Sequence, residues 1–203
     1  MPNLQLHQLR VAAVAKLICE NFEQPIDERS VILACLFHDM GNIIKSDLGQ
    51  FPEFRAGKGR DHWESVKARF VETYGDNAHQ VNVAIAKEIG LPERAVSYID
   101  GISFSNLKKI ARADSYEQKI CEYADTRVGP YGTLSLQARL AEARTRYVES
   151  GKSYYTLEGF ADLSRDAEEI ERQLFRKTRI KPEDITDESI ARFVDELQNY
   201  SVA

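Results

Sequence analysis

Apolar residues recur three and four positions apart along almost the whole chain, and no stretch shows the sustained two-residue alternation of a half-buried strand. Within residues 3–22, for example, Val11, Val14 and Ile18 fall on one face of a helix. This period is typical of amphipathic helices, and it continues beyond the first segment. The sequence therefore predicts an all-α fold.

Turn and capping residues divide this pattern into separate helices. Pro25 ends the first helix, Asp27 can cap the second, and Gly75 and Gly90 follow two later ones. After residue 60, helices are expected to begin at the caps Asp61 and Asn77 and at Pro92. Further helices are expected over residues 115–128, from Ser135 to Ser150, from Thr156 to about Arg179 and from Thr186 to Tyr200.

The run Gly129-Pro130-Tyr131-Gly132 interrupts the helical pattern and suggests a division of the chain. Residues 1–130 contain all four histidines, whereas residues 131–203 contain none and show no obvious chemistry. We expect residues 131–203 to form a C-terminal helical extension. It would complete the core or form the interface of a homodimer.

Composition excludes several classes of protein. A net charge of −5 argues against nucleic acid as the main partner, and no apolar run is long enough to span a membrane. The N-terminus Met1-Pro2-Asn3-Leu4 has neither a basic region nor an apolar signal core, so a cytoplasmic location is expected. The three cysteines, Cys19, Cys35 and Cys121, are odd in number and widely spaced, which favours buried thiols over disulfides or a zinc site.

Ionisable residues fall on three of the predicted apolar faces. Asp39 continues the stripe of the second helix and should point inward, with His38 at its edge. His7 and Asp125 share the buried faces of the first helix and of the helix over residues 115–128. Each alone could be a hydrogen-bonded core residue. Together, two imidazoles and two carboxylates favour a divalent ion such as Mn²⁺, Fe²⁺, Zn²⁺, Co²⁺ or Mg²⁺.

The order of these residues resembles the HD-domain metal-dependent phosphohydrolase superfamily over roughly residues 3–130. His7 is followed by Gln8-Leu9-Arg10-Val11-Ala12, and the pair His38-Asp39 by Met40-Gly41-Asn42. The resemblance implies an HD-domain helical bundle in which His7, His38, Asp39 and Asp125 hold a divalent metal ion, with one ion per chain favoured over two. It implies hydrolysis of a small phosphate ester by a metal-activated water, and a nucleotide is the leading candidate.

Two other functions fit the same resemblance. All four histidines lie in the order found in dinuclear HD proteins, a group that includes cyclic-dinucleotide phosphodiesterases and di-iron oxygenases. An HD-type di-iron oxygenase is therefore one alternative, in which His62 and His79, with Glu64, would serve a second metal. These three residues could instead act as general acid or base, or lie at the surface. The other alternative is a non-catalytic module that binds a nucleotide or a partner chain.

Basic residues near the pair are candidates to hold a phosphate. Residues 43–60 show no clear period and could form a lid over the site. The basic residues of this segment are Lys45, Arg55, Lys58 and Arg60. The candidates to hold a phosphate are Lys45, Lys58, Arg60 and Arg127, which could also be ordinary solvated charges. Arg10, one turn after His7, is expected to orient a metal-binding carboxylate.

Overall fold

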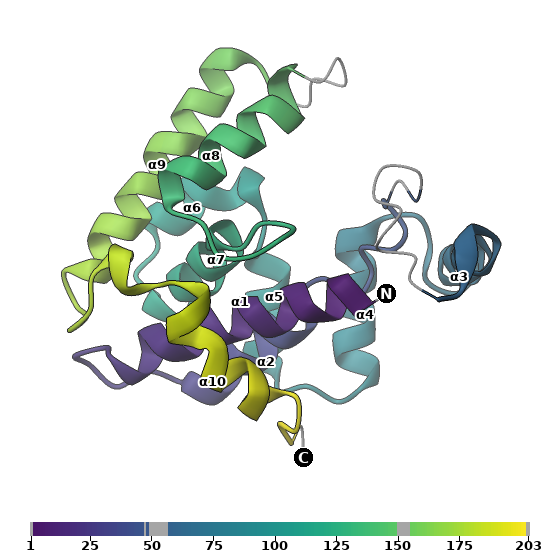
Figure 1. The fold of residues 1–203 in the computed structure, drawn as a ribbon, viewed down its shortest axis with the longest axis horizontal. Coiled ribbons are helices and arrows are strands. Elements are labelled where there is room, and N and C mark those ends of the chain that lie inside the picture. The colour runs from purple at the N-terminus through teal and green to yellow at the C-terminus, as the bar shows by residue number, and fades with distance from the viewer. Residues whose placement is uncertain (1, 47, 49–56, 150–154, 202–203) are drawn as a thin grey trace.

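The computed structural model describes residues 2–46, 48, 57–149 and 155–201, and within these ranges it contains helices and no β-strand (Figure 1). The predicted all-α class is confirmed. The helices are α1 (Pro2–Glu20), α2 (Glu28–Phe37), α3 (Gly59–Tyr74), α4 (Ala78–Glu88), α5 (Glu93–Gly101), α6 (Leu107–Arg112), α7 (Tyr116–Arg127), α8 (Leu136–Arg144), α9 (Leu157–Phe175) and α10 (Asp187–Leu197), with short η2 (Phe104–Asn106), η3 (Thr145–Glu149) and η4 (Pro182–Asp184). None of the described helices is long and apolar enough to cross a membrane.

Most of the expected helix starts are confirmed by side-chain caps. The caps of α2, α4, α8, α9 and α10 each accept a hydrogen bond from a backbone N–H of the first turn; they are Asp27, Asn77, Ser135, Thr156 and Thr186. The expectation for Asp61 is wrong, because α3 already begins at Gly59 and has no side-chain cap. Pro92 precedes α5, and α6 was not expected. The helix expected to reach Ser150, which lies outside the described residues, changes after α8 to the π-helical η3.

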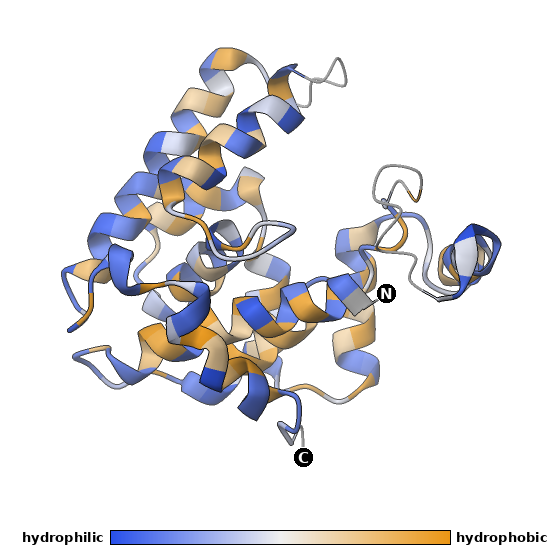
Figure 2. Ribbon diagram, viewed as in Figure 1, coloured by the Kyte–Doolittle hydropathy of each residue, from blue (hydrophilic) through white to orange (hydrophobic). Residues whose placement is uncertain are grey.

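The main core is built around α1, which packs against α2, α7 and α10. Val11, Val14 and Ile18 are fully buried, as the helical pattern predicts. Their burial in a shared apolar interior supplies the main force that holds these helices together. Figure 2 shows hydrophobic residues gathered where α10 crosses α1. Because His7 lies on α1, this packing fixes the position of its ring.

A smaller apolar cluster holds the turn that follows α2. Ile43 and Ile44 pack with Val81 of α4, and Trp63 of α3 lies against them. Gly41 closes this contact: its N–H donates to Asn82 Oδ1 at 2.5 Å, and a Cβ atom there would lie 2.8 Å from the side chain of Val81. Glycine is therefore required for the close approach of this turn to α4. The same turn positions Asp39.

The helices of the C-terminal segment lie against the N-terminal ones. α8 and α9 lie side by side, with α9 against α6 and α7 (Figure 1). The buried Arg127, at the end of α7, donates to the carbonyls of Leu134, Pro182 and Ile185. One side chain therefore connects α7 to both the loop before α8 and the segment before α10. The exact boundary at residue 130 stays a prediction.

Candidate metal centre

Three side chains place metal-binding atoms within 4.8 Å of one another: His7 of α1, His38 at the end of α2, and Asp39 in the next turn. The Nε2 atoms of His7 and His38 each lie 3.7 Å from a carboxylate oxygen of Asp39. This separation is too long for a hydrogen bond. It leaves space for an ion between atoms that bind metals at about 2.0–2.2 Å.

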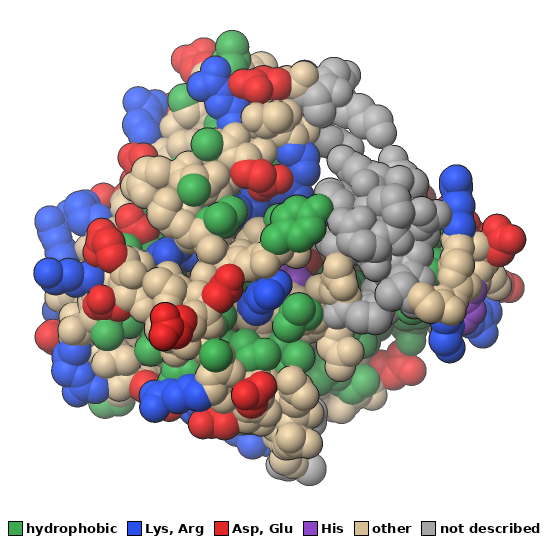
Figure 3. Space-filling view, in the orientation of Figure 1, with side chains coloured by type: hydrophobic (Ala, Val, Ile, Leu, Met, Phe, Trp, Pro, Cys, Tyr) green, Lys and Arg blue, Asp and Glu red, His purple; other side chains and the backbone are tan. Residues whose placement is uncertain are grey.

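Asp125 of α7 joins this group through contacts with both histidine rings. Its Oδ1 atom lies 3.2 Å from Nε2 of His7 and 3.2 Å from Nε2 of His38. The structure thus brings together all four residues expected from the sequence, from α1, from the turn at the end of α2 and from α7. The side chains of His7 and Asp125 are partly exposed, so solvent reaches this region. Figure 3 shows a small area of histidine surface near the middle of this face of the molecule.

The His38 ring has a defined partner at each of its two nitrogen atoms. Nδ1 of His38 lies 2.8 Å from the carbonyl oxygen of Cys35, which can only accept, so Nδ1 carries the proton. If the ring were neutral, Nε2 would then direct a lone pair at the Asp125 carboxylate. Two lone pairs facing each other repel, and either a second proton or a metal ion between them removes the repulsion.

The charges of the group agree with this conclusion. Burial opposes protonation of His38, but the Asp39 and Asp125 carboxylates raise its pKa to about 10. Burial alone would raise the pKa of Asp125, yet His38 and His7 hold it well below its usual value. The carboxylate of Asp125 is therefore ionised and ready to bind a cation. The residues present fit a divalent metal ion with mixed nitrogen and oxygen ligands.

The burial of the pair is the reverse of the sequence expectation. His38 is almost completely buried, at 3% exposure, whereas the Asp39 side chain is 19% exposed. The expectation assumed that α2 continues to Asp39, but the helix ends at Phe37. The backbone turn after this point directs His38 inward and leaves Asp39 at the rim.

Glu122, which the sequence analysis did not single out, is a further buried acid beside the centre. It lies one helical turn before Asp125 on α7, and its Oε2 atom accepts from the backbone N–H of Ser103 at 2.8 Å. Burial, and then the charge of Asp125, raise its pKa to about 8. Its spacing of three residues from Asp125 was the signal that could have found it.

The raised pKa of Glu122 predicts a pH-dependent stability that glutamine should remove. The unfolded glutamate loses its proton near pH 4.5, whereas the folded one keeps it to about pH 8. Between these values the folded state binds the additional proton, so stability falls as the pH rises. In metal-free buffer, we expect Glu122→Gln to unfold several degrees above the wild type at pH 9, since about 1 kcal/mol corresponds to about 2–4 °C in a chain of this size.

Thermal unfolding followed by circular dichroism from pH 5 to pH 9 measures this difference. Glu168→Gln is the matched control, because Glu168 is an exposed glutamate on α9. Its unfolding profile should follow that of the wild type. Parallel profiles for Glu122→Gln and the wild type would contradict the prediction.

The two remaining histidines do not join the centre. Nε2 of His79 lies 3.2 Å from Oδ1 of Asp100, and both side chains are largely exposed. The ring of His62 packs against Trp63 on α3, and Glu64 pairs with Arg60. In the part of the chain that the structure describes, His7, His38 and Asp39 form the single group of three close metal-binding atoms.

The expected roles of two arginines are wrong. The guanidinium of Arg127 is buried, and its N–H groups donate to three carbonyl oxygens and to the hydroxyl of Tyr123, so none remains for a phosphate. Arg10 makes no hydrogen bond or ion pair with Asp39 or Asp125, the two carboxylates of the described site. It therefore does not orient them.

The cations of the predicted lid lie at the surface or outside the described residues. Lys45, Lys58 and Arg60 are exposed, and Arg60 is paired with Glu64. Arg55 lies outside the described residues, as do residues 49–56 in general. The role of Lys45, Lys58 and Arg60 in holding a phosphate stays a prediction.

A comparison with protein-family models matches residues 5–126 to the model described as HD domain. This range includes His7, His38, Asp39 and Asp125, and it covers more than half of the chain. Searches of curated proteins and of solved structures find no match.

Proposed function

The chain belongs to the HD-domain family, and from this premise we propose that it is a metal-dependent phosphohydrolase acting on a small phosphate ester, with a nucleotide as the leading candidate. The observation that carries the proposal is the convergence of two imidazoles and two carboxylates. In particular, Nε2 of His38 faces the Asp125 carboxylate, where either a ring proton or a bound metal ion would stabilise the contact.

Each side chain of the centre would have a defined part in the reaction. His7 and His38 would bind the ion through Nε2, and the Cys35 carbonyl would keep the His38 ring in the required tautomer. Asp39 and Asp125 would bind through carboxylate oxygens and balance its charge. A bound divalent ion would lower the pKa of a water ligand and polarise a phosphoryl oxygen.

We propose one ion per chain and a cytoplasmic location. The described residues contain one group of close metal-binding atoms, and His62 and His79 lie apart from it. Cys19, Cys35 and Cys121 are unpaired and buried, as expected from the sequence. Unpaired thiols are typical of proteins in a reducing compartment.

Metal analysis combined with a substrate screen tests the proposal. The protein is loaded in turn with Mn²⁺, Fe²⁺, Co²⁺, Zn²⁺ and Mg²⁺, and its metal content is measured. Phosphate release is then followed with p-nitrophenyl phosphate and with a panel of mono- and dinucleotides. We expect about one ion per chain, and activity that a chelator removes and added metal restores. A protein that binds none of these ions would contradict the proposal.

The same measurements separate the two alternative functions. A di-iron oxygenase would hold two magnetically coupled iron atoms per chain, which spectroscopy would detect. A non-catalytic module would bind a nucleotide tightly without turnover under every metal. Either result would replace hydrolysis as the assigned function.

A further inference from the structure

Arg10 of α1 is the half-buried arginine of the described residues whose guanidinium has no partner. It makes no hydrogen bond or ion pair, and it lies one helical turn after His7. Three other arginines of the described chain also lack such a contact, but all three are exposed to water: Arg69, Arg112 and Arg176. A charge that is partly withdrawn from water without a counter-charge is unfavourable, and an anion bound beside it removes this cost.

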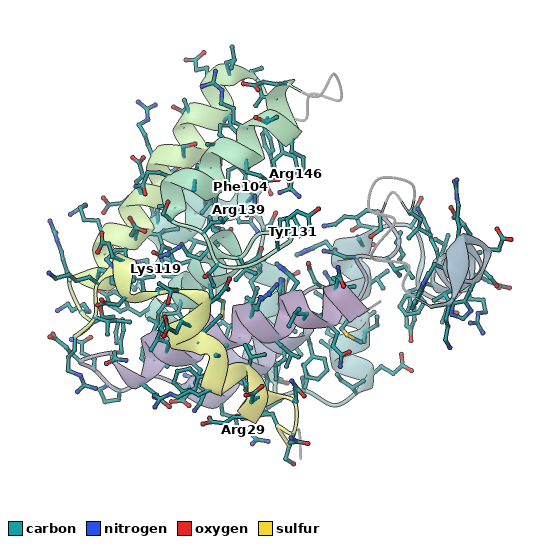
Figure 4. All side chains as sticks on the ribbon, in the orientation of Figure 1. Arg29, Phe104, Lys119, Tyr131, Arg139 and Arg146 are labelled. Carbon is teal, nitrogen blue, oxygen red and sulfur yellow. The ribbon has the colours of Figure 1, made fainter. Side chains whose placement is uncertain are left out.

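The guanidinium groups of the other candidate arginines are already engaged. Arg127 is buried and donates to backbone carbonyls. Arg139 and Arg146, which are labelled in Figure 4, both pair with Glu142 of α8. Within the part of the chain that the structure describes, Arg10 is therefore the arginine that combines a position beside a metal-binding histidine with donors that are still available.

Helix geometry places Arg10 beside His7. Residues three positions apart lie on the same side of an α-helix, with Cβ atoms about 5–6 Å apart. Helical side chains also lean toward the N-terminus of their helix, so the side chain of Arg10 covers the turn that carries His7. In Figure 3, Lys or Arg surface lies next to the small area of histidine surface in this view. The guanidinium of Arg10 is therefore within reach of a ligand bound at the metal centre.

A phosphate bound at the centre needs a positive charge that the metal ligands do not supply. The carboxylates of Asp39 and Asp125 together balance the charge of one divalent ion, and histidines bind metals as neutral rings. A phosphomonoester brings about two further negative charges at pH 7, because its second pKa is about 6. A guanidinium beside the ion offsets part of this charge and donates parallel hydrogen bonds to phosphate oxygens.

We propose that Arg10 binds the phosphate group of the substrate beside the metal ion. This role rests on the proposed hydrolase function, because it places the phosphate at the centre that contains His7. It replaces the role expected from the sequence, since Arg10 pairs with neither Asp39 nor Asp125. It also takes the part expected of Arg127, whose N–H groups are already occupied. The first helix then supplies both a metal ligand and the cation that holds the phosphate.

Calorimetric titration of inorganic phosphate into the Arg10→Gln variant tests this role. The protein is first loaded with the divalent ion that the wild type binds best, and its metal content is measured. We expect the variant to bind phosphate about 10- to 100-fold more weakly than the wild type, as for loss of a charge-assisted hydrogen bond. Its metal content should not change, which separates a phosphate-binding residue from one that positions the metal ligands. Arg10→Lys, which keeps the charge but not the planar donor group, should fall between the two.

Arg112→Gln is the matched control, because Arg112 also makes no hydrogen bond or ion pair but is exposed on α6, which packs mainly against α9. It should bind phosphate as the wild type does. With p-nitrophenyl phosphate as the substrate, Arg10→Gln should raise KM more than it lowers kcat, as expected when an interaction with the bound substrate is lost. Circular dichroism of each variant shows whether it is folded. If Arg10→Gln is not, the comparison of Arg10→Lys with the wild type decides.

The outcomes separate the role of Arg10 from the hydrolase function. If the folded variant binds phosphate as tightly as the wild type, or loses its metal together with phosphate, the role of Arg10 is overturned even where the wild type is a hydrolase. If the wild type binds phosphate through Arg10 but hydrolyses no substrate of the screen, the hydrolase function fails and the binding role stands. A metal-loaded wild type that binds no phosphate overturns the role of Arg10 even if p-nitrophenyl phosphate is hydrolysed.

Discussion

Replacement of Asp39 by alanine is expected to remove the bound metal ion and to lower phosphate release by about 10³-fold or more. Asp39 supplies the carboxylate that lies 3.7 Å from both Nε2 atoms, and without it Asp125 remains as the one acidic ligand of the group. A metal ion contributes several kcal/mol of transition-state stabilisation, and about 1.4 kcal/mol corresponds to a factor of ten in rate. The measurements are metal content per chain and phosphate release under the best metal.

Asp100→Ala is the matched control for this substitution. Asp100 also lies beside a histidine, His79, but the pair is exposed and distant from the three close metal-binding atoms. The control should keep its metal and its activity. A folded Asp39→Ala protein with full metal content and rate would show that the reaction takes place elsewhere.

Replacement of Arg127 by alanine should lower the free energy of unfolding by about 3–5 kcal/mol. The change leaves the carbonyls of Leu134, Pro182 and Ile185 without their buried donor, and each unsatisfied group costs about 1–3 kcal/mol. Water that enters the space offsets part of this loss. Urea denaturation at equilibrium measures the change.

Arg172→Ala provides the comparison, because Arg172 pairs with Glu169 on the partly exposed surface of α9. Exposed pairs contribute about 0–1 kcal/mol, so the control should be nearly neutral. Arg127→Lys should recover part of the stability, since one ammonium group cannot reach all the acceptors. If Arg127→Ala loses less than about 1 kcal/mol but cannot bind nucleotides, the original phosphate-binding role would be correct.

The periodicity of the sequence was sufficient to predict the fold class and most helix starts. Val11, Val14 and Ile18 are buried as their spacing requires, and Asn77 and Thr186 cap the helices that follow them. Such signals are local, because a cap and the backbone N–H group that donates to it lie within one helical turn. The short α6 escaped notice because so few residues show no clear period.

The candidate site could be predicted only in part. The spacing of His38 and Asp39 from the apolar stripe identified candidate ligands, but it could not show where α2 ends or which of the two is buried. The burial of Arg127 depends on the backbone carbonyl groups of Pro182 and Ile185. The positions of these groups cannot be predicted from a pattern of side chains. Arg139 has the sequence context of an ordinary surface arginine on an amphipathic helix, and only the folded structure shows that its side chain is mostly buried.

The packing of α10 on α1 has a consequence for the order of events during synthesis. Arg192 pairs with Glu20, and Lys16 lies over the ring of Phe193. The packing of α1 is therefore completed by a helix that is synthesised much later. All four metal ligands leave the ribosome before α10 does. Until then the apolar face that α10 covers is open to chaperones and proteases. A chain that stops before α10 would therefore expose the part of the core that lies on α1, the helix that carries His7.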